Sequence, residues 1–188
     1  PLIHEEGKSP SELSRKDELF ISNSGLITIA GGKLTGYRLM AKKVVDLISK
    51  QLNINHKYTT ENIKINGGEF DTPDIVQSFI FSIKSRLKSL NLDENKADYL
   101  VRTYGKQANS ILEIFETEKF ESISQAEVWF SLRYDSVITL MDFFLRRTGK
   151  TNFEPLTVMK EATLSLPIFS SFLEWNSNDE KNQLEELK

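Results

Sequence analysis

The stretch that most constrains the fold is QAEVWFSLRYDSVITLMDFFLRRTG, which runs from Gln125 to Gly149. At helical spacing it is apolar on most sides until the arginines near its end. A helix that is apolar all round is stable only when other helices cover it, so this stretch belongs at the centre of a bundle. The preceding residues, Ser124 to Glu127, have the order of a capping box. We therefore expect one long helix over 125–147.

The segments on either side of this stretch supply the partner helices that a bundle needs. An apolar stripe at helical spacing runs from Ile75 to Leu90. It follows Thr72, which suits a helix cap, and Pro73, which suits the first helical position. Further helices are expected at about 93–104, 106–115 and 154–173, and in the charged tail that ends the chain.

The first third of the chain has a different pattern. GLITIA, at 25–30, is short, apolar and β-branched, which is typical of a buried strand. Two glycines and a lysine follow it, and 34–52 then shows the apolar stripe of an amphipathic helix. Residues 1–23 are mostly polar and predict a surface segment with one short helical turn. No second convincing strand is visible in the sequence.

These patterns predict a mainly α protein in two parts. Residues 1–66 would contain the strand, the glycine–lysine loop and the first helix. Residues 67–188 would form an all-helical domain, a helical bundle. Gly67-Gly68 is the best boundary, since paired glycines interrupt regular structure.

Composition excludes several classes of function. The formal net charge is -3 and the pI is about 5.6, which argues against a nucleic-acid partner because such domains are basic. The chain has no cysteine, so disulfides and cysteine-based zinc sites are excluded, as a reducing cytoplasmic setting would allow. Its two histidines, His4 and His56, lie far apart in polar stretches, and we predict no metal site. No apolar run approaches the roughly 20 residues of a membrane-spanning helix.

The sequence IAGGKLTG places a flexible, cationic corner between the expected strand and helix. The start of a helix presents unpaired backbone N–H groups and a partial positive charge. Glycines allow a ligand to approach the backbone, and Lys33 adds a full charge, so the corner could bind an anion. A tight turn with a solvent-exposed lysine explains the same residues, and physics alone favours that simpler reading. The spacing matches neither a dinucleotide fingerprint nor a Walker A loop.

SRKDELFISNSGLITIAGGKLTGYRLMAKKVVDLI closely resembles the family of FAD-dependent glycerol-3-phosphate dehydrogenases and oxidases. In that family a strand ending in GGK, followed by a threonine-containing segment, closes the flavin domain. LVRTYGKQANSILEI and the stretch from Gln125 to Gly149 are similar to the family's C-terminal helical domain. The family usually has a second threonine at the position of Gly36, which leaves a hydroxyl contact there in doubt.

This resemblance implies that the chain is the C-terminal portion of a flavoenzyme. Residues 1–66 would be the strand–loop–helix remnant of an α/β FAD-binding domain, and the cofactor FAD would be bound mainly by an N-terminal domain outside this chain. The complete enzyme would oxidise glycerol 3-phosphate to dihydroxyacetone phosphate by hydride transfer to the flavin. The chain by itself would then be inactive and bind no FAD.

The resemblance also assigns roles to individual residues. It implies flavin contacts from Gly31, Gly32, Lys33, Leu34 and Thr35. Lys33 would serve the flavin or the substrate and is the catalytic candidate. Arg15, in the SRKDE segment, would bind the substrate phosphate, for which a guanidinium is well suited. A surface arginine that pairs with Asp17 or Glu12 is the competing interpretation for Arg15.

Other polar residues have weaker claims. His4 is a general-base candidate because it lies near the substrate-side segment, and Arg38 projects from the first turn of the expected helix. Arg146 and Arg147 could bind an anionic partner, but pairing of Arg146 with Asp142 at i,i+4 is the simpler prediction.

The electron acceptor would be membrane quinone or molecular oxygen, and the sequence does not decide between them. The implied enzyme would be cytoplasmic, with association at the inner face of the membrane and a homodimer as compatible arrangements. A stand-alone helical interaction module is the alternative. The partner of the GLITIA strand separates the two: a fragment leaves it unpaired, whereas an independent module provides a partner.

Overall fold

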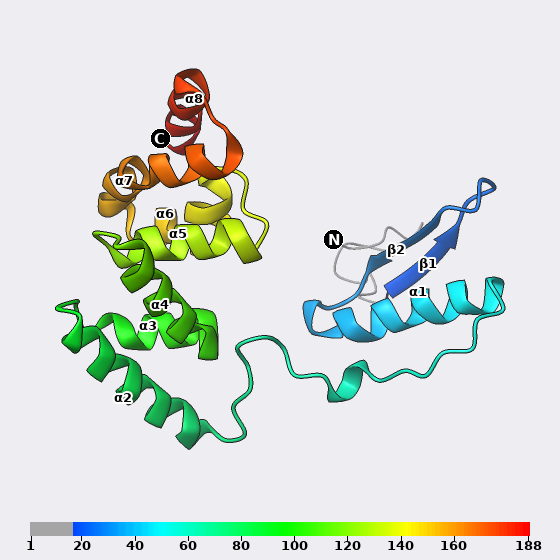
Figure 1. Ribbon diagram of the computed structural model, residues 1–188. Helices are drawn as coiled ribbons and strands as arrows, with labels where there is room; N and C mark the ends of the chain where they lie inside the picture. Colours follow the sequence, from blue (N-terminus) through cyan, green and yellow to red (C-terminus); the bar gives the residue numbers. More distant parts are fainter. Residues whose placement is uncertain (1–16) are drawn as a thin grey trace, which may run out of the picture. The chain divides into compact units, whose positions relative to one another are not determined.

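The computed structural model describes residues 17–188 and divides the chain into two compact units, each of which we treat separately (Figure 1). The first unit ends at Ile63, and the second extends from Lys64 to Lys188. Arg15 and His4 lie outside the described residues. The described elements of the first unit are β1 (Asp17–Ile21), β2 (Ile27–Gly31), the 3-10 turn η1 (Leu34–Gly36), α1 (Tyr37–Gln51) and the 3-10 turn η2 (Thr60–Asn62).

β1 and β2 form an antiparallel hairpin, so the prediction of a strand without a partner is wrong. Asp17 lies opposite Gly31 in the ladder. The turn closes on Ser22, whose hydroxyl accepts the backbone N–H of Leu26 at 3.1 Å. The sequence hides β1 because DELFI begins with two acidic residues, which are disfavoured in strands, and shows no alternation. The side chains of β2 are half-buried or exposed, not fully buried.

α1 forms where the apolar stripe predicts it, with η1 as its tightened first turn. His56 lies beside this helix, with its Nε2 3.2 Å from a carboxylate oxygen of Asp46. Among the described residues, no three histidine, cysteine or acidic side chains cluster as metal ligands would. His56 is therefore a surface pairing residue.

The second unit is all-helical among its regular elements, and the prediction of a mainly α fold is confirmed. In Figure 1, α5 runs through the middle of this unit, with α4 on one side and α7 on the other. No described helix has both the length and the apolar character needed to cross a bilayer. The elements are α2 (Pro73–Ser89), α3 (Lys96–Tyr104), η3 (Gly105–Gln107), α4 (Ala108–Glu118), α5 (Ile123–Tyr134), the π-helix η4 (Asp142–Arg147), α6 (Lys150–Phe153), α7 (Pro155–Leu173) and α8 (Ser177–Leu187).

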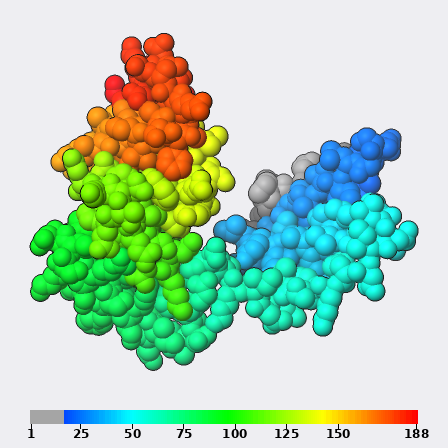
Figure 2. Space-filling view, in the orientation of Figure 1, coloured from blue at the N-terminus to red at the C-terminus, as the bar shows by residue number. Residues whose placement is uncertain are grey.

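Two hydrophobic cores hold this unit together, and α5 contributes to both. Ala126 and Phe130 belong to the core shared with α2, α3 and α4, whereas Val128 belongs to the core shared with η4, α7 and α8. The space-filling view shows the helices from α2 to α8 as one continuous body (Figure 2). α5 is thus the central helix that the apolar sequence predicts.

The predicted long helix over 125–147 is nevertheless wrong, because α5 ends at Tyr134. Ser136 takes a left-handed backbone conformation, with φ of 57°. A new helical start then forms around Thr139 and Asp142. The Asp142 carboxylate accepts the backbone N–H of Thr139 at 3.0 Å, and the Thr139 hydroxyl accepts the backbone N–H of Asp142 at 3.0 Å. Serine, threonine and aspartate compete for backbone hydrogen bonds in this way, and here they interrupt the helix.

The capping box of α5 also differs from the prediction. Ser122, not Ser124, caps the helix: its hydroxyl accepts the backbone N–H of Gln125, and the Gln125 side chain accepts the backbone N–H of Ser122 at 3.2 Å. The helix therefore begins at Ile123. This shift of two residues leaves Ser124 and Glu127 to face the interior, where both are buried.

The turn between α5 and η4 offers a direct test of the second core. Val137 is 3% exposed and Leu140 is fully buried, whereas Ile138 between them is 61% exposed. We expect Val137→Asp or Leu140→Asp to lower the free energy of unfolding by about 3 kcal/mol or more, since each buries an unpaired charge. Urea denaturation measures the effect. Ile138→Asp is the matched control and should change stability little; equal losses in all three variants would contradict this packing.

Candidate functional site

The corner after β2 is formed by two glycines in the left-handed region. Gly31 has φ of +82° and Gly32 has φ of +79°, values that side-chain-bearing residues adopt only at a cost. A Cβ on Gly32 would lie 2.7 Å from the sulfur of Met40, so the Met40 side chain would have to move, and the positive φ would strain any other residue there. The chain therefore turns sharply over the side of α1 and directs the next residues outward.

Lys33, Leu34 and Thr35 are all exposed at this corner. Lys33 is extended, and its carbonyl accepts the backbone N–H of Gly36 at 2.8 Å, which starts the helical turn. The first backbone N–H groups of a helical segment have no partner within it, and they lie at the positive end of its dipole. The corner thus presents backbone donors and one ammonium group on the same surface.

A hollow of about 340 Å³ lies beside the corner. Lys43 forms an ion pair with Asp17 here, and its hydrogen bond holds the pKa of the Asp17 carboxyl below the usual value. Lys43 is therefore already engaged, whereas Lys33 is exposed to solvent. The lining residues are Asp17, Gly32, Lys33, Thr35, Gly36, Leu39, Met40 and Lys43.

Of the five consecutive corner residues that the sequence singles out, Gly32, Lys33 and Thr35 line the hollow, and Gly31 and Leu34 do not. Arg15 cannot be placed, since it lies outside the described residues. Arg38 stacks over the ring of Tyr58, with 5.5 Å between the guanidinium carbon and the ring centroid. This contact gives Arg38 a structural partner away from the corner.

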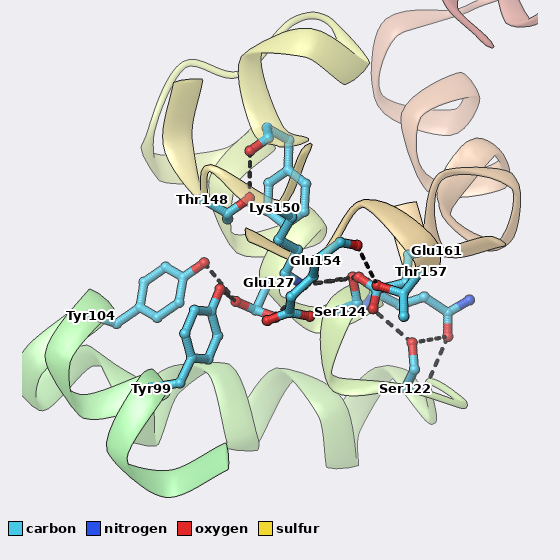
Figure 3. A network of polar contacts seen from close by, with 12 residues as sticks. Tyr99, Tyr104, Ser122, Ser124, Glu127, Thr148, Lys150, Glu154, Thr157 and Glu161 are labelled. Carbon is cyan, nitrogen blue, oxygen red and sulfur yellow. Dashed lines mark hydrogen bonds and ion pairs between the residues drawn. The ribbon is translucent and has the colours of Figure 1, made fainter. Parts of the chain in front are cut away.

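A second polar centre lies inside the helical unit, around Glu127 (Figure 3). One Glu127 carboxylate oxygen accepts the hydroxyls of Tyr99 at 2.6 Å and Tyr104 at 3.0 Å. The other lies 3.3 Å from the ammonium of Lys150. Burial, together with the charge of Glu127, raises the pKa of both tyrosines, so both remain donors.

Lys150 is shared between two carboxylates. Its Nζ lies 2.9 Å from Glu161, and the hydroxyl of Ser124 donates to the same Glu161 oxygen at 2.7 Å. Burial alone would lower the pKa of Lys150, but the charges of Glu127 and Glu161 outweigh it and raise the pKa. Burial likewise opposes ionisation of Glu161, yet the charge of Lys150 holds its pKa below the usual value. The six residues joined by these contacts are called the Glu127 network: Tyr99, Tyr104, Ser124, Glu127, Lys150 and Glu161.

The Glu127 network has the features of a structural centre, not of a reaction site. Glu127 is 1% exposed and Lys150 is 3% exposed, and each charged group has hydrogen-bonding partners. The sequence analysis missed it, because it assigned Glu127 to a capping box and gave Lys150 no role. The available signal was a glutamate embedded in an otherwise apolar stretch, since such residues are rarely buried without a partner.

Comparison with known proteins identifies the family. Residues 58–180 match the family model for the C-terminal domain of alpha-glycerophosphate oxidase. The chain belongs to this family. The resemblance seen in the sequence is thereby confirmed, and the match covers the helical unit except most of α8.

Longer relatives match the entire chain, including the glycine–lysine corner. The chain is 35% identical over 198 residues to the aerobic glycerol-3-phosphate dehydrogenase of Staphylococcus saprophyticus and 36% identical over 199 residues to that of Bacillus subtilis. It covers 36% of each relative, so it spans about a third of their length. A solved structure, the glycerol-3-phosphate dehydrogenase from Bacillus halodurans complexed with FAD, matches 90% of this chain and 36% of its own, with a TM-score of 0.78 and 29% identity.

Removing the cation of the Glu127 network should be costly. Lys150→Met leaves the buried Glu127 without its counter-charge, and breaking a buried pair in this way costs about 3–5 kcal/mol. Urea denaturation measures the loss. Lys160→Met, at an exposed position of α7, is the matched control, and Glu127→Gln combined with Lys150→Met should recover part of the loss. If Lys150→Met were as stable as Lys160→Met, the pair would have no structural role.

Glu161 should make part of this stability depend on pH. Its pKa is lowered in the folded state from 4.5, so its contribution is complete above that pH and is lost as the pH falls through the folded pKa. The difference in melting temperature between the wild type and Glu161→Gln should be large near neutral pH and shrink below 4.5. Glu118→Gln, at an exposed position of α4, should show a small difference throughout. A constant difference for Glu161→Gln would refute the lowered pKa.

Proposed function

We propose that this chain is the C-terminal portion of an FAD-dependent enzyme that oxidises glycerol 3-phosphate to dihydroxyacetone phosphate. The observation that carries the proposal is the corner from Gly31 to Thr35. It presents open backbone donors and a lysine at a helix start, within a chain that matches aerobic glycerol-3-phosphate dehydrogenases along its whole length. A redox reaction on an anionic substrate needs positive potential of this kind.

One observation does not support this proposal: a fragment was expected to leave the GLITIA strand unpaired. β1 pairs with β2, as a stand-alone module would require. A two-stranded hairpin is marginally stable in water without further strands or a covering helix, however, so the pairing does not make the first unit independent. The whole-chain match to longer flavoenzyme relatives carries more weight, and we prefer the enzyme to the interaction module.

The corner fits a flavin. Gly32 has no side chain and a positive φ that favours glycine, so a planar ligand edge would meet the backbone there. Gly31, Gly32, Leu34 and Thr35 would hold FAD through backbone N–H groups and the Thr35 hydroxyl. When bound, FAD would supply the hydride acceptor. Most of its binding surface would come from parts of the enzyme outside this chain, since the chain spans about a third of its relatives.

Lys33 would act on the charge that develops during the reaction. Its ammonium and the helix start would stabilise negative charge as the substrate is oxidised, without having to reorganise. Arg15 would hold the substrate phosphate through its planar fork of donors. Because the phosphate is the same before and after hydride transfer, this second contact would favour binding more than chemistry.

Three further features of the complete enzyme remain proposals. The electron acceptor is membrane quinone or molecular oxygen, and comparing quinone reduction with oxygen uptake by the full-length enzyme separates the two. We place the enzyme in the cytoplasm, at the inner face of the membrane if quinone is the acceptor. A homodimer is the oligomeric state that we would test, by light scattering.

The two cationic residues should differ in their kinetics in the full-length enzyme. Arg15→Met should mainly raise KM, by roughly tenfold to a hundredfold for a lost charged hydrogen bond. Lys33→Met should mainly lower kcat and slow anaerobic flavin reduction followed by absorbance. Lys50→Met, at an exposed position of α1, is the control and should leave both constants unchanged.

Other outcomes would revise these roles. If Lys33→Met raises KM alone, Lys33 is a second phosphate ligand. If neither variant alters steady-state kinetics, the corner is only a turn, and the site assignment is wrong.

A further inference from the structure

A hollow of about 580 Å³ on the helical unit has no role in the proposed reaction. The loop of residues 65–68 borders it, together with α3, α5 and η4. Its apolar wall includes Phe70, Val76 and Phe130. Three arginines line it as well: Arg102, Arg146 and Arg147. We call it the arginine pocket.

Carboxylates hold all three guanidinium groups but use only part of their donors. Arg102 donates from Nε to Asp98 at 2.6 Å, and Arg147 donates from Nε to Asp135 at 3.0 Å. Arg146 pairs with Asp142, as the sequence predicts. Each guanidinium has five N–H donors, so each keeps donors for a ligand while its partner fixes its orientation.

The π-helix η4 brings two of these arginines to the pocket. Its wide turn is closed by the backbone N–H of Thr148, which donates to the carbonyl of Phe143 at 3.0 Å. Phe143 and Phe144 are fully buried in the second core, while Arg146 and Arg147 both line the hollow. π-helical turns are rare and are frequently found at functional sites.

Close backbone contact fixes the opposite wall. Gly67 has φ of +81°, and a Cβ there would lie 2.5 Å from the carbonyl oxygen of Tyr104. The Gly67 carbonyl accepts the backbone N–H of Lys106 at 2.9 Å, which ties the loop to the end of α3. Tyr104 also belongs to the Glu127 network. This wall is thus formed before any ligand arrives, which reduces the ordering cost of binding.

We propose that the arginine pocket binds a phosphate monoester that carries a flat apolar group. The volume lies within the range of small-molecule sites, about 300–1,000 Å³, and so does the mixture of apolar wall and few polar groups. Asp135 is the one carboxylate among the lining residues. Asp98 and Asp142, which do not line the hollow, neutralise the other two arginines, so the phosphate would be held by the N–H donors that the three guanidinium groups keep and not by an excess of charge. This inference does not rest on the proposed oxidation of glycerol 3-phosphate.

Calorimetric titration of the 188-residue chain with phenyl phosphate at low salt tests the proposal. We expect binding in the millimolar range or tighter, with inorganic phosphate and phenol both binding at least about tenfold more weakly, because each lacks one half of the recognition. The variant Arg102→Gln with Arg146→Gln should weaken phenyl phosphate by about tenfold or more. Both side chains are mostly exposed, at 65% and 64%, so the fold should be retained, which a thermal melt verifies.

The matched control is Lys88→Gln with Lys160→Gln, which removes the same charge from exposed positions of α2 and α7 that do not line the pocket. It should bind phenyl phosphate as the wild type does. Three results would overturn the proposal: no binding of phenyl phosphate, equal weakening in the control, or equally tight binding of phenol or of inorganic phosphate.

Discussion

The helical unit depends on one buried ion pair, between Glu127 and Lys150. Burying two charges is costly unless both are closely paired and hydrogen-bonded. Here the partners come from different helices: the tyrosines from α3, Glu127 from α5, Lys150 from α6 and Glu161 from α7. The charges are therefore satisfied only when all four helices are in place, which joins the two hydrophobic cores on either side of α5 into one cooperative structure.

The glycine–lysine corner depends on a steric constraint instead. Gly32 lies against the side chain of Met40 with a positive φ, so any other residue there would be strained and would displace that side chain. The chain must turn at this point, and the turn exposes Lys33 and the first backbone donors of η1. In the complete enzyme that we propose, the same geometry would provide a preformed positive potential for the flavin. The cost of forming it is met in folding, through the contact between the corner and α1, before any cofactor binds.

Sequence reasoning succeeded for elements whose signal is local and periodic. The helices α1 and α2 follow apolar stripes and the corner follows from its two glycines, so the helices and the corner could be predicted. It failed where side chains have two roles. Ser124 and Glu127 look like a cap but lie in the interior, and Thr139 and Asp142 look like helix interior but form a cap. β1 was missed because its stabilisation comes from pairing with β2, which a short acidic segment does not reveal.

The sequence by itself determined the class of the fold, the central place of α5, the composition of the corner and the family. These follow from periodicity and from motifs of neighbouring residues, which can be recognised in the sequence without a structure. Only the tertiary structure decided that Glu127 meets Lys150, and that Arg102 lies beside Arg146 and Arg147 around one hollow. Glu127 is far from Lys150 along the chain, and Arg102 is far from Arg146 and Arg147. Whether they meet therefore depends on how the helices pack. Packing is set by the summed burial of many side chains, so no single stretch of sequence specifies it.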